Sequence, residues 1–161
     1  MIKTLAITVM IWAMAQGAVA QGMSFGNADQ DTDAPVEVVA DALSVNQTDG
    51  TALYTGDVIV SQDDMRLSAP RVLVIYSEDA GRIDRMEATG GVTLVSGDEA
   101  AEAARADYDF TSDTIVLSGE VLVTQGDSAI SAQRMTIQLD DGTAEMSGRV
   151  RTVLGQGNEE N

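Results

Sequence analysis

The sequence contains no cysteine and no histidine, and these two absences exclude several kinds of chemistry. Without cysteine the chain has no disulfide bond and no thiolate metal site. Without histidine it has no imidazole ligand and no Ser-His or Cys-His catalytic pair. The sequence therefore predicts no cofactor, no metal and no enzymatic activity. A hydrolase that uses Asp63 and Asp64 is disfavoured, because adjacent residues at a turn point to different sides.

Positive charge and aromatic side chains are both scarce. Lysine and arginine number 9 against 26 aspartate and glutamate residues, which gives a formal net charge of −17. A chain this acidic repels phosphates, so nucleic acid is excluded as a partner. Aromatic residues make up 4% of the chain, so the interior must be lined by Val, Ile, Leu and Met. The 161 residues are enough for one domain with such a core.

The first twenty residues have the pattern of an export signal. Lys3 supplies a positive end, and residues 5–15 form an apolar run that is short for a bilayer span. The small residues that end at Ala20 fit a cleavage site, with Gln21 as the first mature residue. We therefore expect a signal peptide over 1–20 and a periplasmic location. The alternative is an uncleaved leader that anchors the chain in a membrane.

Two polar segments flank the predicted domain. Residues 21–35 are rich in Gly, Asn and Asp, which predicts a disordered linker. Residues 155–161 predict a polar C-terminal tail. The folded domain is therefore expected over residues 36–154.

One stretch, residues 55–72, recurs along the chain. Residues 118–135 repeat it 63 positions later, with eight of eighteen residues identical and six more closely similar. A shorter unit, a hydroxyl residue followed by Gly, any residue and Val, occurs four times, with its glycines at positions 56, 90, 119 and 148. Such a repeat of β-branched residues around glycine predicts stacked strands that each turn a corner at the glycine.

Alternation of apolar and polar residues extends this prediction to the whole domain. Short alternating runs are separated by turn sequences such as Asp-Gly about every ten residues. Residues 99–105 are an exception, because their Ala and Glu composition favours a helix. A strand is preferred there, since the segment occupies a strand position in the repeat and lacks a long apolar stripe. The predicted fold is all-β and antiparallel, with two packed sheets or one rolled sheet.

Several of these motifs resemble a known family. The stretches that carry the resemblance are Ala40–Leu43, Thr51–Val60, Leu67–Val72, Ile83–Gly90 and Leu117–Gln125. Together they are similar to the OstA-like superfamily of lipopolysaccharide-transport proteins, which includes LptA, LptC and LptD. The repeated Thr-Gly-x-Val with a downstream Ala-x-Arg-Val is fairly specific to this superfamily. The cleavable leader and short C-terminus favour the soluble LptA-like branch over the anchored LptC-like branch.

The resemblance implies an antiparallel β-jellyroll of two opposed, twisted sheets with an open hydrophobic groove. It implies that lipid A acyl chains lie in the groove and that the protein carries lipopolysaccharide from the inner to the outer membrane. It also implies LptC-like and LptD-like partners and a head-to-tail homo-oligomer joined at strand edges. The residues expected to line the groove are Val58, Val60, Leu67, Val72, Val74, Leu94, Val121, Val123, Ile130, Met135, Ile137 and Leu139. Those expected at the joining edges are Val36, Val38, Ala40, Val150, Thr152 and Leu154.

The predicted domain departs from the family in having no lysine. Contact with lipopolysaccharide phosphates would then need one of five arginines, unless the phosphates project into solvent, which is the preferred interpretation. These arginines are Arg66, Arg71, Arg134, Arg149 and Arg151. The residues alone favour a closed core instead of a groove. In that case the protein would be a β-sheet adaptor that docks partners by its edges and binds no lipid.

Overall fold

The structure, a computed structural model, describes residues 23–26, 30–79 and 81–155. Every regular element in these ranges is a β-strand, and no helix long and apolar enough to cross a membrane occurs in them. The strands are β1 (Met23–Ser24), β2 (Glu37–Val39), β3 (Ala42–Asn46), β4 (Thr51–Gln62), β5 (Met65–Tyr76), β6 (Ile83–Ser96), β7 (Glu99–Asp109), β8 (Thr114–Gln125), β9 (Ser128–Gln138), β10 (Thr143–Ser147) and β11 (Arg151–Val153).

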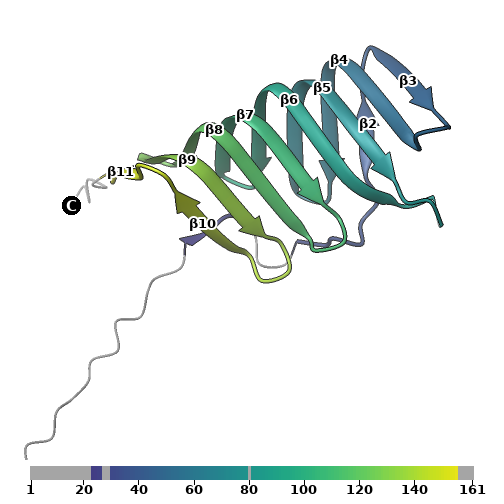
Figure 1. Cartoon of the computed structure of the whole chain (residues 1–161). Coiled ribbons are helices and arrows are strands. Elements are labelled where there is room, and N and C mark those ends of the chain that lie inside the picture. The colour runs from purple at the N-terminus through teal and green to yellow at the C-terminus, as the bar shows by residue number, and fades with distance from the viewer. Residues whose placement is uncertain (1–22, 27–29, 80, 156–161) are drawn as a thin grey trace, which may run out of the picture.

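All strands belong to one antiparallel sheet that does not close on itself (Figure 1). Its order is β1-β10-β9-β8-β7-β6-β5-β4-β2, with β11 paired to β9 and β3 paired to β4. Strands β2 and β3 pair with different halves of β4, and β11 and β10 pair with different halves of β9. The sheet is therefore folded into two opposed layers, and the predicted all-β, antiparallel, jellyroll-like fold class is confirmed.

Each long strand contributes one half to each layer. Layer 1 contains β2, β11, the second halves of β4, β6 and β8, and the first halves of β5, β7 and β9. Layer 2 contains β1, β3, β10 and the remaining halves. Every ladder between long strands shifts register where the strands pass between layers, so each ladder pair lies within a single layer.

The bends form a row, here called the corner line, at the four repeated glycines. Each glycine and the residue after it have positive φ angles, for example 82° at Gly119 and 49° at Glu120. A Cβ atom built on Gly119 would lie 2.6 Å from the Cβ atom of Ala104 on the neighbouring strand. Glycine is required there for both its backbone conformation and its small size. The corners predicted at these glycines are present.

The core lies between the layers and is formed by alternate residues of the long strands. Val58, Val72, Leu117, Met135 and Ile137 are each 0% exposed. Residues 99–105 lie in β7, as the strand prediction required. Their inward side chains are alanines, which explains how a helix-favouring composition is accommodated in a tightly packed sheet.

Opposite the corner line, the hairpin turns of the two layers form two rows, and this side of the folded sheet is here called the mouth. Residues 25–26 and 30–36, here called the strap, lie along it between β1 and β2 (Figure 1). Phe25 is 3% exposed and belongs to the core cluster, and β1 pairs with β10. The expected disordered linker over 21–35 is therefore wrong for the described part of that range. Buried aromatic area and strand pairing fix the segment, and composition alone does not reveal either.

Candidate functional site

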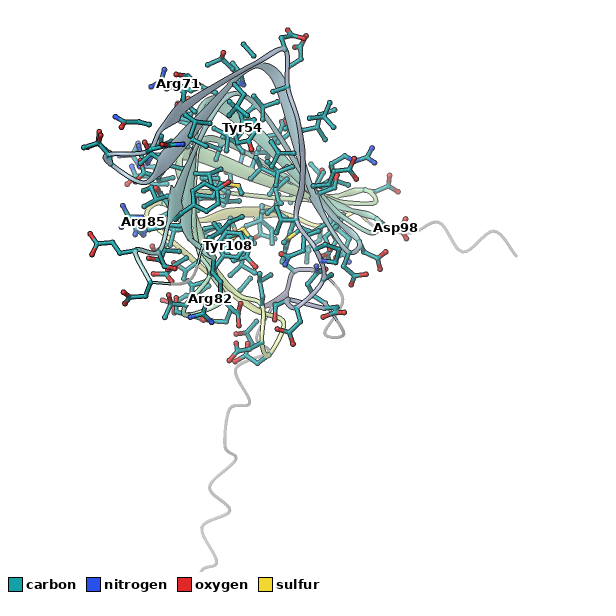
Figure 2. All side chains as sticks on the ribbon, turned by 90° about the vertical axis from the view of Figure 1, so that its right-hand side faces the viewer. Tyr54, Arg71, Arg82, Arg85, Asp98 and Tyr108 are labelled. Carbon is teal, nitrogen blue, oxygen red and sulfur yellow. The ribbon has the colours of Figure 1, made fainter. Side chains whose placement is uncertain are left out.

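The twelve residues expected to line a groove all face the space between the layers. Eleven of them are buried, and Ile130 is half-buried beside β11. Figure 2 views the sheet from one end and shows Tyr54 and Tyr108 among the side chains that fill this space. In this conformation the interior is therefore packed with aliphatic side chains.

One small hollow remains within this interior near the mouth. It has a volume of about 20 Å³, room for about one water molecule. Its lining is formed by Val36, Val60, Gln62, Met65, Leu67, Met86, Leu94, Tyr108, Phe110 and Ile115. Two of these residues are methionines, whose flexible side chains repack more readily than branched ones. This end of the core can therefore change shape at low cost in free energy.

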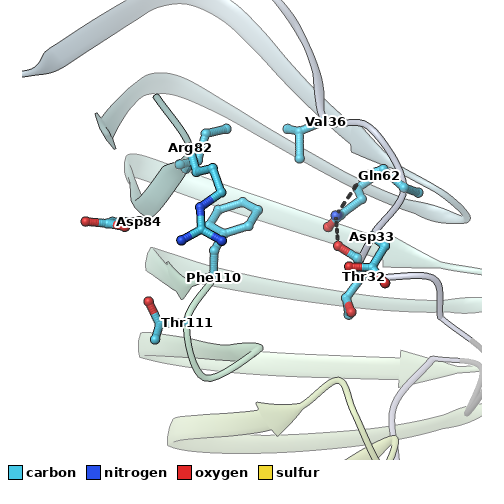
Figure 3. Close-up of a pocket in the computed structure, with 10 residues that line it drawn as sticks. Thr32, Asp33, Val36, Gln62, Arg82, Asp84, Phe110 and Thr111 are labelled. Carbon is cyan, nitrogen blue, oxygen red and sulfur yellow. Dashed lines mark hydrogen bonds between the residues drawn. The ribbon is translucent and has the colours of Figure 1, made fainter. Parts of the chain in front are cut away.

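A larger surface pocket of about 530 Å³ lies directly outside the hollow (Figure 3). Strap residues line one side of it, and the turns before β6 and after β7 line the other. Val36, Gln62 and Phe110 line both the pocket and the hollow. These three side chains therefore separate solvent from the interior.

Gln62 connects three parts of the mouth and is 4% exposed. Its side-chain Nε2 donates to the carbonyl oxygens of Thr32 at 2.8 Å and Ala34 at 3.1 Å, both in the strap. Its Oε1 accepts from the hydroxyl of Tyr108 in layer 2 at 3.1 Å. Its backbone oxygen accepts from Nε2 of Gln30 at 3.0 Å. One buried amide at the end of β4 thus joins layer 1, layer 2 and the strap, and we call these hydrogen bonds the Gln62 latch.

Further contacts fix the strap to layer 1. The backbone N–H of Asp31 donates to Asp63 Oδ2 at 3.0 Å, and the N–H of Gly26 donates to a carboxylate oxygen of Glu99. Asp63 thus binds the strap. Among the described residues no group of three acidic side chains is placed to hold a metal ion.

Burial and acidic neighbours govern the ionisation of groups at the mouth. Tyr108 stacks on Phe110 with ring centroids 3.9 Å apart, and burial followed by the charge of Asp113 raises the pKa of its phenol. The hydroxyl therefore stays protonated and continues to donate to Gln62. Burial is also the first cause that raises the pKa of Asp113, followed by the charges of Asp140, Asp33 and Asp109.

The arginines considered for phosphate contact are all exposed. Arg66 and Arg71 alternate with inward residues of β5, so they lie on the outer face, and Figure 2 shows Arg71 on the outside of the sheet. Arg134 lies outward on β9, while Arg149 follows the last corner glycine and Arg151 lies in β11. The arginine that lines the mouth pocket is instead Arg82, with Asp33 and Asp84 in the same lining.

The predicted joining edges lie at opposite ends of the sheet. Val36, Val38 and Ala40 are half-buried, and Val36 lies at the mouth rather than on a free edge. Val150 is 51% and Leu154 is 73% exposed, and Thr152 is exposed in β11. Strand β3 is a further outer strand, with Leu43 54% and Val45 61% exposed.

Sequence reasoning did not identify Phe25, Gln62, Arg82 or Phe110 as site residues. The one available signal was Phe25, because a lone aromatic residue in a polar segment is a candidate anchor. Nothing local distinguishes Gln62 from its repeat counterpart Gln125, which is exposed. The predicted cleavage site at Ala20 and Gln21 lies outside the described residues.

The comparison with family models identifies one family. Residues 37–143 match the model of a family described as LptA/(LptD N-terminal domain) LPS transport protein, where LPS is lipopolysaccharide. An uncharacterized protein of Rhizobium meliloti (strain 1021) is 31% identical over 114 residues, which span 66% of this chain and 59% of that protein.

A solved structure shares the fold. The crystal structure of LptH from Pseudomonas aeruginosa is described as that of the LptA homologous periplasmic component of the conserved lipopolysaccharide transport device. It superposes with a TM-score of 0.70 and 17% sequence identity, covering 79% of this chain and 99% of that chain. At this identity the match concerns the fold alone.

Proposed function

The chain belongs to the LptA/LptD N-terminal family of lipopolysaccharide-transport proteins, and we propose that it is a periplasmic bridge that carries lipopolysaccharide from the inner to the outer membrane. In this proposal the interior shields the acyl chains of lipid A. The family is one of transport proteins rather than enzymes, so the proposed role of the site is binding.

The observation that carries the proposal is an aliphatic interior inside a sheet that does not close. Each CH₂ group removed from water contributes about 0.8 kcal/mol, so one acyl chain gains several kcal/mol in such a space. The interior is filled in this conformation, so binding requires the layers to part. The exposure of all five candidate arginines to solvent supports a headgroup that stays in solvent.

Photo-crosslinking from paired positions tests lipid binding. A photoreactive residue replaces inward Val60 or Val123, and in matched controls it replaces outward Ile59 or Leu122 on the same strands. The inward positions are expected to capture lipopolysaccharide in cells and the outward positions are not. Equal capture from both faces, or capture from neither, would contradict the proposed groove.

A second candidate function is supported by the packed interior itself. A β-sheet adaptor that docks partners by its edges needs no space between its layers. For such a protein Val60→Asp would lower stability and transport together, in proportion to the fraction unfolded. If the protein is a lipid carrier, Val60→Met, which keeps the core apolar, should change lipid capture while the protein remains folded.

Head-to-tail association of copies, and of LptC-like and LptD-like partners, is proposed at the sheet ends. The end that contains β11 exposes Arg149 and Arg151, whereas the end that contains β2 and β3 exposes Glu37 and Asp41. The opposite charges of these exposed residues favour a joint between the β11 end of one copy and the β2–β3 end of the next. Open outer strands supply backbone partners for strand addition.

A charge reversal tests this joint. The double variant Arg149→Glu/Arg151→Glu is expected to weaken self-association about tenfold at low salt and much less at high salt, because screening removes the charge contribution. Analytical ultracentrifugation measures the association, and Arg66→Glu/Arg71→Glu on the outer face of β5 is the control with the same change in net charge. If the control weakens association equally, the general net charge and not the ends would be responsible.

A further inference from the structure

Two hollows of different character meet at the mouth. The interior hollow is small and mainly apolar, whereas the surface pocket outside it is larger and contains Arg82, Asp33 and Asp84. The side chains common to both linings, those of Val36, Gln62 and Phe110, stand between them at this point. Figure 3 shows Val36 and Gln62 on one side of the pocket and Arg82 and Phe110 on the other.

The barrier at this point is held by few interactions. Gln62 donates to two strap carbonyls and accepts from Tyr108 across the mouth, and Val36 is half-buried above the hollow. Separation of the layers about the corner line breaks no ladder pair, since every pair lies within one layer. Movement here therefore requires loss of the latch and displacement of the strap, with Val36, from the end of β4, while the ladders between the long strands stay intact.

The occupant that fits behind the barrier is a hydrocarbon chain. Beyond Gln62 and Tyr108 the hollow is lined by aliphatic and aromatic side chains, including the flexible Met65 and Met86. A charged group would lose hydration there without a partner. In the outer pocket one arginine stands with two aspartates, so that pocket does not select an anionic group strongly. The charged head of an amphiphile would remain in water while its tail passes inward.

We propose that this junction is the portal through which a single acyl chain enters the interior, and that the Gln62 latch keeps the portal closed until the chain displaces the strap. The inference rests on the proposed function, because it concerns the same lipid. It assigns where the acyl chain enters and states that the strap is displaced as the chain does so. It also assigns a role to the strap, which covers the mouth beside the lipid-binding space.

A reversible lock on the strap tests the portal. Glu37 and Ser61 are directly opposed in the β2–β4 ladder, a spacing that suits a disulfide, and the chain has no other cysteine. The variant Glu37→Cys/Ser61→Cys holds Val36 against β4 when oxidised. The matched control Thr93→Cys/Glu102→Cys joins opposed residues of β6 and β7 away from the strap. Stopped-flow uptake of cis-parinaric acid, a fatty acid that fluoresces in apolar surroundings, gives the rate.

Oxidation of the Glu37→Cys/Ser61→Cys variant, here called the β2–β4 lock, is expected to slow uptake about tenfold or more. Reduction is expected to restore the rate. Oxidation of the control pair should leave the rate unchanged. A second variant, Gln62→Leu, removes the side-chain hydrogen bonds of the latch and puts an apolar side chain of similar size in their place, and it should speed uptake severalfold. Far-UV circular dichroism on each variant checks that the sheet is intact.

The results separate the portal from the groove. If the oxidised β2–β4 lock and Gln62→Leu both take up the fatty acid at the rate of the native protein, the portal is overturned, while the proposal of a lipid-binding interior is unaffected. No uptake by any variant, together with no lipopolysaccharide capture at Val60 or Val123, would overturn the proposed function and the portal with it. Slower uptake in both disulfide variants would also overturn the portal, since general rigidity would then set the rate.

Discussion

The corner line, along which the sheet bends, and the mouth, on the opposite side, are held in different ways. At the corner line one backbone geometry repeats four times, at glycines followed by a second residue of positive φ. At the mouth, side chains such as Gln62, Tyr108 and Phe25 hold the strap and the layers. A bend fixed by backbone conformation keeps its geometry, whereas a side held by side-chain contacts can open when those contacts are lost.

The comparison predicts the largest stability loss at the corner line. Gly119→Ala forces a Cβ atom into a left-handed conformation and against Ala104, and it is expected to lower the free energy of unfolding by about 3 kcal/mol. Gly91→Ala is the matched control, because Gly91 also has positive φ but no atom lies within 4 Å of its added Cβ. It should cost about 1 kcal/mol. Equal losses in urea unfolding would show that steric contact at the corner is unimportant.

Loss of the strap anchor should have the next largest effect. Phe25→Ala removes the burial of an aromatic ring, with an expected loss of about 2–3 kcal/mol. Hydrogen exchange should quicken at Gly26 and Asp31, while the corner amides keep their protection. Val39→Ala, at a residue 55% exposed, is the control and should be nearly neutral. If protection fell equally at the corners, the strap would be part of the global fold and not a separate element.

A double-mutant cycle measures how much the Tyr108–Gln62 hydrogen bond contributes to stability. Tyr108→Phe leaves Gln62 Oε1 without its donor and should cost about 1 kcal/mol, because a buried acceptor loses its partner. With Gln62→Leu already present, the same change should cost much less. Thermal or urea unfolding of the four proteins gives the coupling free energy. A coupling near zero would mean that the Tyr108–Gln62 hydrogen bond does not stabilise the closed mouth.

The smallest expected effect is a gain in stability from relief of acidic crowding. The pKa of Asp113 is raised, so the folded state binds its proton more tightly than the unfolded chain does. Asp113 therefore lowers stability at neutral pH, and this penalty disappears as the pH falls through the raised pKa. Asp113→Asn should stabilise the protein by up to about 0.5 kcal/mol at pH 7, with no gain once the pH is low enough to protonate the native carboxyl. Asparagine also tolerates the positive φ of 49° at this position.

Melting curves at neutral and acidic pH measure this difference. The gap in melting temperature between Asp113→Asn and the native protein should narrow as the pH falls. A variant that melts lower than the native protein at pH 7 would show that the carboxylate makes a favourable interaction at the mouth.

Much of the fold could be predicted because the information is local. The four repeated glycines lie at the corners, and residues 99–105 form a strand as the repeat required. The groove-lining set follows from strand parity, and its members do face inward. Whether they contact lipid stays a prediction. The mouth could not be predicted, and Val36, expected at a joining edge, lies at the pocket because the strap brings it there.

The sequence by itself determined the strands, the four corners and the aliphatic interior, because alternation and glycine conformation act within a few residues. Only the tertiary structure decided that a polar N-terminal segment covers the mouth, that Gln62 is buried, and that the interior is packed when the strap is in place. These features depend on contacts between residues far apart in the chain, such as the 46 positions that separate Gln62 from Tyr108. Local propensity carries no information about such pairs.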